Sequence, residues 1–563
     1  MSTAIFPHIN ARLLRTVWLL LAALAVPVAE PALALAAEDT GSAGKRIYRE
    51  GVLPSGEPLR GVVRNGAVLS GTAAACAGCH RRSGLGGGEG QNAVRPIAGR
   101  MLFVSAQGRP GQRPLGPYGG NVETRPVYTL HTLARALREG VDPSGRRLDV
   151  LMPRFEIGDD DVRQLAAYLW QLAPVNAPGV TGSEIHFATV IAADTEPSLE
   201  KAMLDVMQAF FAGKNGSTRQ EQRRREVGRS VTGSEQMYRA YRKWQMHPWK
   251  LSGPQDSWPE QLAEYYRAQP VFAVLGGVGK GNWQPVHEFC EQNEIPCLFP
   301  SIDFSGLASS GYSSFYFSRG AELEAGVLAA HLAASGARGG IVQVFRDDAA
   351  GRAPAQALHA ALQQHGGFTV VDRLLPAGKS VSGAFWDRLL VEEQPHILVL
   401  WLNDADLEHF PLQRAAPPGM SSVYVSASLL AQTGRMQQSA GWKDKVRIVD
   451  QSEPMTRRAQ HLSRMNIWLR SRDIPLADER IQANTFFAVS LAGDALAHME
   501  ENFSRDYFIE RVEHMTEQSL FHSVYPRLSL GPGQRFASKG GYVTGFMADE
   551  GQGAAPLSEW IVP

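Results

Sequence analysis

Short apolar runs recur through the C-terminal two thirds of the chain, and segments with helical spacing separate them. Continuous apolar strands that alternate with helices are typical of parallel sheets covered on both faces. The region from residue 183 to residue 563 is too long for one such sheet, so the pattern predicts two α/β lobes. The predicted strands include Phe187–Ile191, Val271–Leu275, Gly340–Phe345, His396–Trp401, Val423–Ser426 and Val446–Val449.

Two amphipathic helices are predicted ahead of this region. Residues 162–172 place their apolar side chains on one helical face, and three aspartates stand where the helix should begin. Carboxylates stabilise a helix N-terminus, so they mark this start. Residues 133–142 are expected to form a second helix, which Gly140 ends.

The N-terminal pattern predicts export. Arg12 and Arg15 precede an apolar run from Val17 to Val28, and Ala34–Ala36 supplies small residues for cleavage. The run is too short for a comfortable membrane span, so residues 1–37 are interpreted as a cleavable signal peptide. The mature protein is therefore expected in the periplasm, without a stable membrane span.

Charge and motif content narrow the function classes. Fifty-six basic residues balance fifty-six acidic ones, which argues against a nucleic-acid partner. Gly276–Gly281 resembles a phosphate-binding loop but lacks the required first glycine and the hydroxyl after the lysine. No nucleophile–base pattern stands out, so the chain is not expected to be an enzyme.

The motif Cys76-Ala77-Gly78-Cys79-His80 predicts a covalent haem c. Two thiols at this spacing can add to the vinyl groups of one porphyrin, and the adjoining histidine can bind the iron. A thioredoxin-like pair would follow a strand, and a zinc site would need more ligands nearby; neither is found in the sequence. The sequence therefore predicts one haem, attached through Cys76 and Cys79 and bound at the iron by His80.

The sixth iron ligand decides whether a haem transfers electrons or binds gases. Met152 stands on a short loop before the helix over residues 162–172 and is the favoured ligand. Met101, His131 and an open coordination position are the alternatives. A Met/His pair would raise the haem potential and favour electron transfer over oxygen activation.

These segments together resemble class I cytochrome c. The Met152-Pro153 loop, the acidic helix start, the Tyr168-Leu169-x-x-Leu172 sequence and the glycine-ended helix carry the resemblance. It implies a small all-α cytochrome c domain over residues 40–175, with His80 and Met152 as the axial pair. Gly44 and Tyr48 resemble the family's N-terminal helix, which crosses the last helix.

One segment departs from the simplest members of that family. Residues 50–75 intervene between the N-terminal helix and the haem motif, and they contain several glycines and prolines. This insertion is expected to cover a haem edge or to form a docking surface.

After a linker at residues 176–184, the order of strands and helices over residues 185–563 resembles the type I periplasmic binding proteins, the branched-chain amino acid receptor family. Four segments carry the resemblance: Pro270–Gly277, Ile295–Ser301, Ser314–Gly320 and Phe345–Asp348. The fold class expected for the whole chain is therefore multidomain, with a small all-α cytochrome c domain followed by a two-lobed α/β domain.

In such a fold a ligand lies between the lobes, at loops that leave the C-terminal ends of the strands. Glycines and serines at those places also commonly form the turn and nothing more. The candidate cleft residues are Gly277, Gly279, Ser301, Asp303, Asp347, Asn403 and Ser426.

Three functions follow from these features. The leading one is a periplasmic electron carrier that exchanges electrons with a dehydrogenase or another cytochrome. Residues 525–541 resemble a tail of binding proteins that accompany PQQ-dependent alcohol dehydrogenase systems, which suggests such a partner. The second is a solute receptor of an ABC importer, in which the haem is a redox sensor or a structural element. The third is a redox subunit whose second domain catalyses.

The two cysteines outside the haem motif leave one alternative open. Cys290 and Cys297 would lie at a helix end and in the following strand. A structural disulfide and a pair of buried thiols are equally compatible with this placement in an oxidising compartment.

Overall fold

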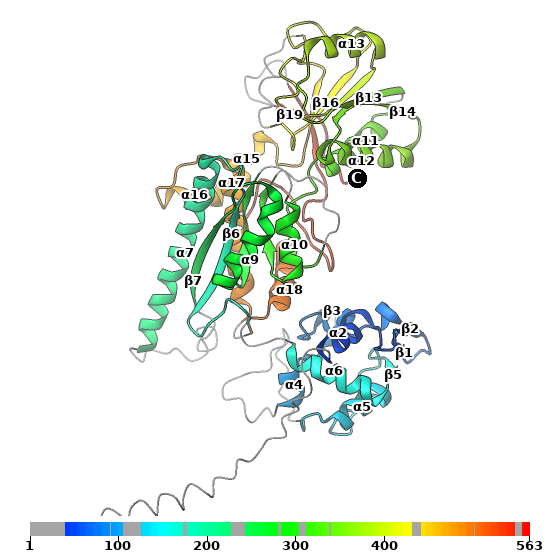
Figure 1. The fold of residues 1–563 in the computed structure, drawn as a ribbon, viewed down its shortest axis with the longest axis vertical. Helices are drawn as coiled ribbons and strands as arrows, with labels where there is room; N and C mark the ends of the chain where they lie inside the picture. Colours follow the sequence, from blue (N-terminus) through cyan, green and yellow to red (C-terminus); the bar gives the residue numbers. More distant parts are fainter. Residues whose placement is uncertain are drawn as a thin grey trace, which may run out of the picture. The chain divides into compact units, whose positions relative to one another are not determined.

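The protein is described here by a computed structural model (Figure 1). The structure describes residues 40–89, 92–104, 125–172, 177–226, 242–279, 283–302, 311–336, 339–430, 441–499, 502–546 and 554–563. The chain divides into two compact units. Unit 1 contains residues 1–78 and 125–170, and unit 2 contains residues 79–124 and 171–563.

Unit 1 contains the helix crossing expected of a cytochrome. Helix α2 (Thr40–Glu50) packs on α6 (Asp159–Gln171), and the rings of Tyr48 and Tyr168 lie 5.5 Å apart between their centroids. A Cβ atom at Gly44 would overlap the carbonyl oxygen of Gln164, so glycine permits the close approach of the two helices. Helix α5 (Leu130–Glu139) begins with a capping box at Thr129 and ends at Gly140, whose φ is 70°.

The insertion at residues 50–75 adds a small sheet to this helical unit. Strands β1 (Arg60–Val62) and β2 (Val68–Ser70) form an antiparallel hairpin, and β1 also pairs with β5 (Arg154–Glu156). The short helix η1 (Gly71–Ala74) follows β2. This part of the chain is thus helical with an added three-stranded sheet, which the all-α expectation omitted.

The haem motif forms a short helix, and a hairpin and a second short helix of unit 2 follow it. Helix α3 (Cys76–His80) begins in unit 1 and ends in unit 2. The hairpin of β3 (Gly87–Glu89) and β4 (Asn92–Val94) comes next, and then helix α4 (Gly99–Phe103).

The first lobe of the large region is a parallel sheet with the order 2-1-3-4-5 along its main strands. These are β7 (Lys243–Lys250), β6 (Glu184–Ile191), β8 (Ala273–Leu275), β10 (Cys297–Leu298) and β12 (Ser314–Phe315). Strands β9 (Val278–Gly279) and β11 (Ser301–Ile302) extend the sheet beside β6. Neighbouring β6 residues point to opposite faces, and Phe187 and Ala188 belong to separate buried clusters.

Helices cover both faces of this sheet. They are α7 (Pro197–Glu226), α9 (Trp258–Ala268), α10 (Gln284–Gln292), α17 (Glu479–Ala497) and α18 (Arg505–Thr516), with η3 (Gln255–Ser257) before α9. Helices α17 and α18 belong to a late part of the chain that returns to this lobe, together with α15 (Met455–His461) and α16 (Ser463–Arg470).

The second lobe repeats the strand order. Its sheet runs β14 (Phe368–Leu375), β13 (Gly339–Arg346), β15 (Ile397–Trp401), β16 (Ser422–Ser426) and β17 (Val446–Asp450), all parallel. Antiparallel β18 (Tyr542–Phe546) and β19 (Ala554–Pro556) complete the edge. The helices are α11 (Ala321–Ala334), α12 (Ala349–His365) and α13 (Gly383–Glu393).

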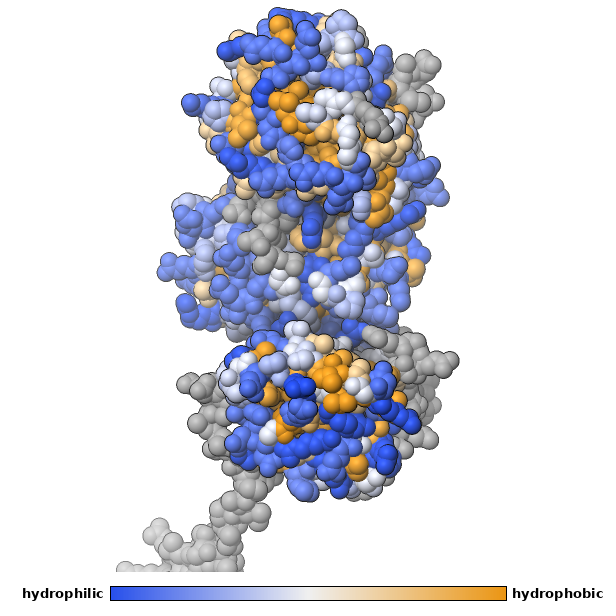
Figure 2. Space-filling model, turned by 90° about the vertical axis from the view of Figure 1, so that its right-hand side faces the viewer, coloured by the Kyte–Doolittle hydropathy of each residue, from blue (hydrophilic) through white to orange (hydrophobic). Residues whose placement is uncertain are grey.

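The prediction of two α/β lobes with parallel sheets is therefore confirmed. The chain passes between the lobes after β12, after β17 and before β18. On the face shown in Figure 2 the surface is largely hydrophilic, with apolar patches interspersed. Within the described ranges, no helix has the length and apolar character needed to cross a membrane.

Candidate functional site

The haem motif forms a single turn of helix. Cys76, Cys79 and His80 lie on α3 at spacings of three and four residues, which place side chains on one helical face. Cys76 is half-buried and Cys79 is exposed. The other two cysteines are joined in a disulfide and so do not compete with this pair.

The imidazole of His80 is oriented by the backbone. Its Nδ1 lies 3.0 Å from the carbonyl oxygen of Arg95, and because a carbonyl only accepts, Nδ1 carries the proton. Nε2 then holds the lone pair that iron requires. Burial lowers the pKa of His80, and the hydrogen bond to Arg95 acts in the opposite direction. A neutral, oriented histidine beside two cysteines on one helical face fits a covalent haem.

Arg95 is a part of this site that the sequence analysis missed. It follows the β3–β4 hairpin, which returns the chain toward His80. Gly86 donates its N–H to the carbonyl of His80 at 3.0 Å and has a φ of 71°, a conformation that favours glycine. The glycines after the motif were the available signal, because a chain that must fold back closely needs such residues.

The loop that carries Met152 is held by hydrogen bonds within unit 1. Met152 donates its N–H to the carbonyl of Asp149 at 3.2 Å, and Arg154 donates to the carbonyl of Met152 at 2.5 Å. The guanidinium of Arg154 occupies the space that a side chain at Gly140 would need. Met152 is half-buried. Its role as the sixth ligand stays a prediction.

The inserted hairpin supports this same loop. Gly61 on β1 faces Pro153 and Phe155, and a Cβ atom at Gly61 would lie 2.9 Å from the Cβ of Pro153. The residues directly after Met152 are therefore fixed by strand pairing as well as by the turn. The alternative ligands lie elsewhere: Met101 on α4 is half-buried, and His131 on α5 is exposed.

In the first lobe, the candidate cleft residues pack against their own protein. Gly277 and Gly279 are buried, and the ring of Trp283 would be 3.2 Å and 3.1 Å from Cβ atoms built on them. Ser301 is buried and donates its N–H to the carbonyl of Gly277 at 2.8 Å. Asp303 lies outside the described residues.

In the second lobe, two candidates are exposed and bonded locally. Arg352 donates to Asp347 at 2.6 Å. The side chain of Asn403 accepts the N–H of Asp406 at 3.1 Å, and Asp406 forms an ion pair with Arg346. These contacts stabilise the loops that leave β13 and β15.

Ser426 belongs to a buried polar cluster around Glu324 of α11. Ser426 donates to one oxygen of Glu324, and Ser428 donates its N–H and its hydroxyl to the other at 3.1 Å and 2.6 Å. Gln451 donates to Glu324 at 3.1 Å and to the carbonyl of Gly320 at 2.8 Å. The cluster thus joins β16 to two of the segments that connect the lobes.

The carboxyl of Glu324 has an altered acidity. Burial raises its pKa to about 7, the hydrogen bonds from Ser426 and Ser428 lower it, and the nearby Asp450 raises it. Burial also raises the pKa of Asp450, which Arg458 opposes. Sequence analysis singled out the serine but not its partner, because the two are 102 residues apart.

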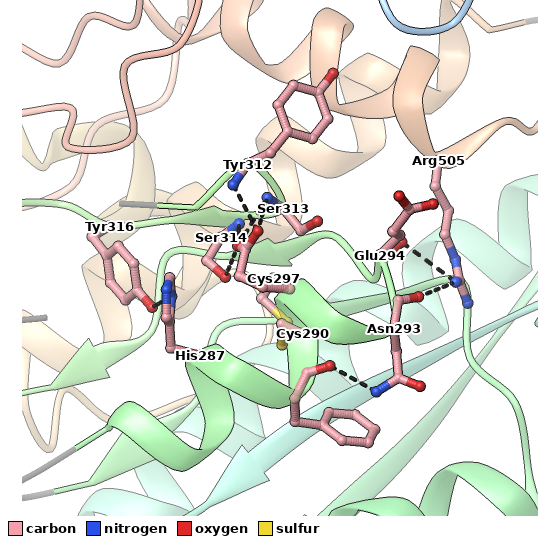
Figure 3. Close-up of a disulfide and its surroundings, with 12 residues drawn as sticks. His287, Cys290, Asn293, Glu294, Cys297, Tyr312, Ser313, Ser314, Tyr316 and Arg505 are labelled. Atoms are coloured by element: carbon pink, nitrogen blue, oxygen red, sulfur yellow. Dashed lines mark hydrogen bonds between the residues drawn. A yellow bond between two sulfur atoms is a disulfide. The ribbon is translucent and has the colours of Figure 1, made fainter. Parts of the chain in front are cut away.

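The disulfide between Cys290 and Cys297 settles the alternative that the sequence left open. It joins the end of α10 to β10, with a Cα–Cα distance of 6.3 Å (Figure 3). Beside it, Glu291 accepts the N–H groups of Tyr312, Ser313 and Ser314 at 2.6 to 3.0 Å. The bridge therefore fixes the carboxylate that holds the start of β12.

Comparison with known proteins agrees with this arrangement. The Cytochrome c family model matches residues 63–173, so this part of the chain is a cytochrome c domain. No curated protein sequence matches the chain closely enough to count as a relative.

Several solved structures are similar to about two thirds of this chain. One is a branched-chain amino acid ABC transporter from Thermus thermophilus with bound valine, at 11% identity and a TM-score of 0.47, covering 68% of this chain and 98% of that one. A leucine binding protein from Thermotoga maritima is 11% identical with a TM-score of 0.47, and the match covers 67% of this chain and 99% of that one. A fatty acid ABC transporter substrate-binding protein from Thermomonospora curvata is 14% identical with a TM-score of 0.48, and the match covers 69% of this chain and 95% of that one. The two-lobed fold itself follows from the strand order described above.

Replacing Met152 tests the predicted sixth ligand. In Met152→Ala the ferric protein should lose its thioether-to-iron absorption band, and the midpoint potential should fall because a thioether favours ferrous iron. Met101→Ala serves as the matched control and should keep both. If the band survives in Met152→Ala and disappears in Met101→Ala, the assignment is wrong.

Glu324 should make the stability of the large region depend on pH. Because its folded pKa of about 7 exceeds its usual value of 4.5, the folded state holds the proton more tightly. The contribution of the protonated Glu324 carboxyl to the free energy of unfolding is fully present below about pH 4.5 and is lost as the pH rises through about 7. Denaturant unfolding of Glu324→Gln should show a flatter decline over that range than the wild type. An unchanged slope would contradict the assignment, and the exposed Glu392→Gln is the control.

Proposed function

We propose that this protein is a periplasmic monohaem electron carrier whose α/β region serves to dock a partner or to bind a small molecule. The oriented His80, next to the two motif cysteines on one helical face, is the observation that carries the proposal. Cys76 and Cys79 would hold the haem covalently, and His80 and Met152 would bind its iron. When bound, the haem supplies one-electron exchange between ferrous and ferric iron.

Outer-sphere transfer requires a partner to come close to the haem. The residues just before Met152 are apolar and exposed: Val150 is 45% and Leu151 is 60% exposed. Apolar side chains that reach into solvent beside a redox site support a docking role, since apolar surface is what the core of a protein interface buries. We propose a PQQ-dependent alcohol dehydrogenase as the electron donor, on the resemblance carried by residues 525–541.

A solute receptor with a redox-sensing haem is the second candidate, and the two-lobed fold favours it. Proteins with two α/β lobes commonly bind small ligands where the loops at the strand ends meet. Against it stand the contacts of the candidate residues, since Trp283 covers the glycines and Glu324 engages Ser426. The electron carrier is therefore the leading proposal.

Stopped-flow mixing of the oxidised protein with a PQQ-dependent alcohol dehydrogenase and its alcohol tests the proposal. The ferrous haem α band should appear in a fast, saturable phase. The rate should change little between low and high salt, because the proposed contact is apolar and not ionic. Leu151→Ser should slow this phase without changing the midpoint potential. A haem that dithionite reduces but the dehydrogenase does not would contradict the proposed donor and favour the receptor.

A further inference from the structure

The residues directly after the haem motif are anchored on helix α18. Ser83 is fully buried. Its N–H donates to one carboxyl oxygen of Glu510 at 2.8 Å, and its hydroxyl donates to the other at 2.7 Å. Both residues belong to unit 2, although 427 positions separate them in the sequence. A side chain of the large region thus binds the chain three residues beyond His80 through two hydrogen bonds.

Arg82 provides a second contact in the same place. Its guanidinium carbon lies 3.5 Å from the centroid of the Tyr312 ring, and its nitrogens lie 3.8 Å from Asp506 and 3.7 Å from Glu294. The side chain is only 25% exposed. A cation on an aromatic face between two carboxylates is held more firmly than an exposed ion pair.

The surface that receives Arg82 is itself fixed. Tyr312 donates its N–H to Glu291 at 2.6 Å, beside the Cys290–Cys297 disulfide (Figure 3). The buried Arg535 lies 4.7 Å from the centroid of the same Tyr312 ring and donates to Glu513 of α18 at 2.6 Å. The receiving site is therefore formed by α18 and by the residues next to α10 and β12, and contacts that do not involve Arg82 or Ser83 hold it in place.

Both carboxyl oxygens of Glu510 accept a hydrogen bond from Ser83. Burial raises its pKa to about 8, and the two hydrogen bonds from Ser83 act in the opposite direction. A buried carboxyl is costly unless polar groups satisfy both oxygens. Here the groups that satisfy them come from the haem segment.

Ser83 in turn controls the fold of the segment that orients His80. Its hydroxyl oxygen accepts the N–H of Leu85 at 3.1 Å, and Gly84 accepts the N–H groups of Ile97 and Ala98 at 2.7 Å and 3.1 Å. These bonds hold the residues that follow Arg95, whose carbonyl accepts from His80. Glu510 is thus connected to His80 through Ser83 and through the turn that Ser83 begins.

We propose that helix α18 is part of the haem site, and that Glu510 is a positioning residue that holds Ser83 and so keeps His80 aligned with the Arg95 carbonyl. The proposal rests on the haem ligation proposed above. It makes the α/β region a structural support of the redox centre, so that a change in this lobe alters the haem potential.

The test is an equilibrium redox titration of the full-length holoprotein. In Glu510→Ala the turn loses both hydrogen bonds, and the bond between His80 and Arg95 weakens. A histidine with a weaker Nδ1–H bond is a poorer donor to ferric iron, so the midpoint potential should rise. The expected rise corresponds to an increase of about threefold to tenfold in the equilibrium constant for reduction, the effect of one hydrogen bond.

Three further variants complete the test. Glu510→Gln keeps an acceptor for the Ser83 N–H and should return the potential most of the way to the wild-type value. Ser83→Ala keeps the N–H bond to Glu510 but loses the hydroxyl, which donates to Glu510 and accepts from Leu85. It should also raise the potential, which decides the matter if Glu510→Ala does not fold. Glu517→Gln, at an exposed position just beyond α18, should change nothing.

A wild-type potential in both Glu510→Ala and Ser83→Ala would overturn the proposal, because a residue that only stabilises the fold would leave the potential unchanged. The titration uses chemical mediators and needs no dehydrogenase. If the dehydrogenase proves not to be the electron donor, the titration can therefore still be interpreted.

Discussion

The hydrogen bond from Nδ1 of His80 to the carbonyl of Arg95 is the interaction on which the haem site depends. It fixes the tautomer and the ring orientation, and so determines which nitrogen is offered to iron. Such a bond requires the chain to fold back within fifteen residues, and the glycines and the β3–β4 hairpin after the motif make this turn. The anchor of Ser83 on Glu510 then ties the turn to the large region.

The inserted hairpin plays a comparable role for Met152. By pairing with β5 it fixes the strand that begins at Arg154, two residues after the predicted ligand. A methionine on a mobile loop would let the iron exchange ligands, whereas a loop held from both sides favours one coordination. The two predicted iron ligands are thus each supported by backbone pairing in their own unit.

The sequence was most informative where the chemistry is local or the burial is complete. The haem motif occupies one turn of helix, and the six predicted strands are apolar because helices cover both faces of their sheets. Strands β7 and β14 were not predicted, since both lie at sheet edges and mix polar with apolar residues. Pro248 also weakens the strand pattern in β7, although an edge strand tolerates proline.

The candidate cleft shows the opposite case. Position after a predicted strand nominated Gly277, Ser301 and Ser426, but it could not reveal that Trp283 packs against the glycine or that Glu324 accepts from Ser426. Those partners come from helices that reach the sheet only in the folded protein. Ser83 and Glu510 are an extreme example, because no local pattern links residues 427 positions apart.

The proposed electron carrier requires a six-coordinate haem that does not bind gases. The most direct test is to add carbon monoxide to the dithionite-reduced protein and record its absorption spectrum. Two firmly held axial ligands leave no position for the gas, so the Soret and α bands should stay unchanged. A rapid shift of the Soret band would show an open or weakly held sixth position and would contradict the account.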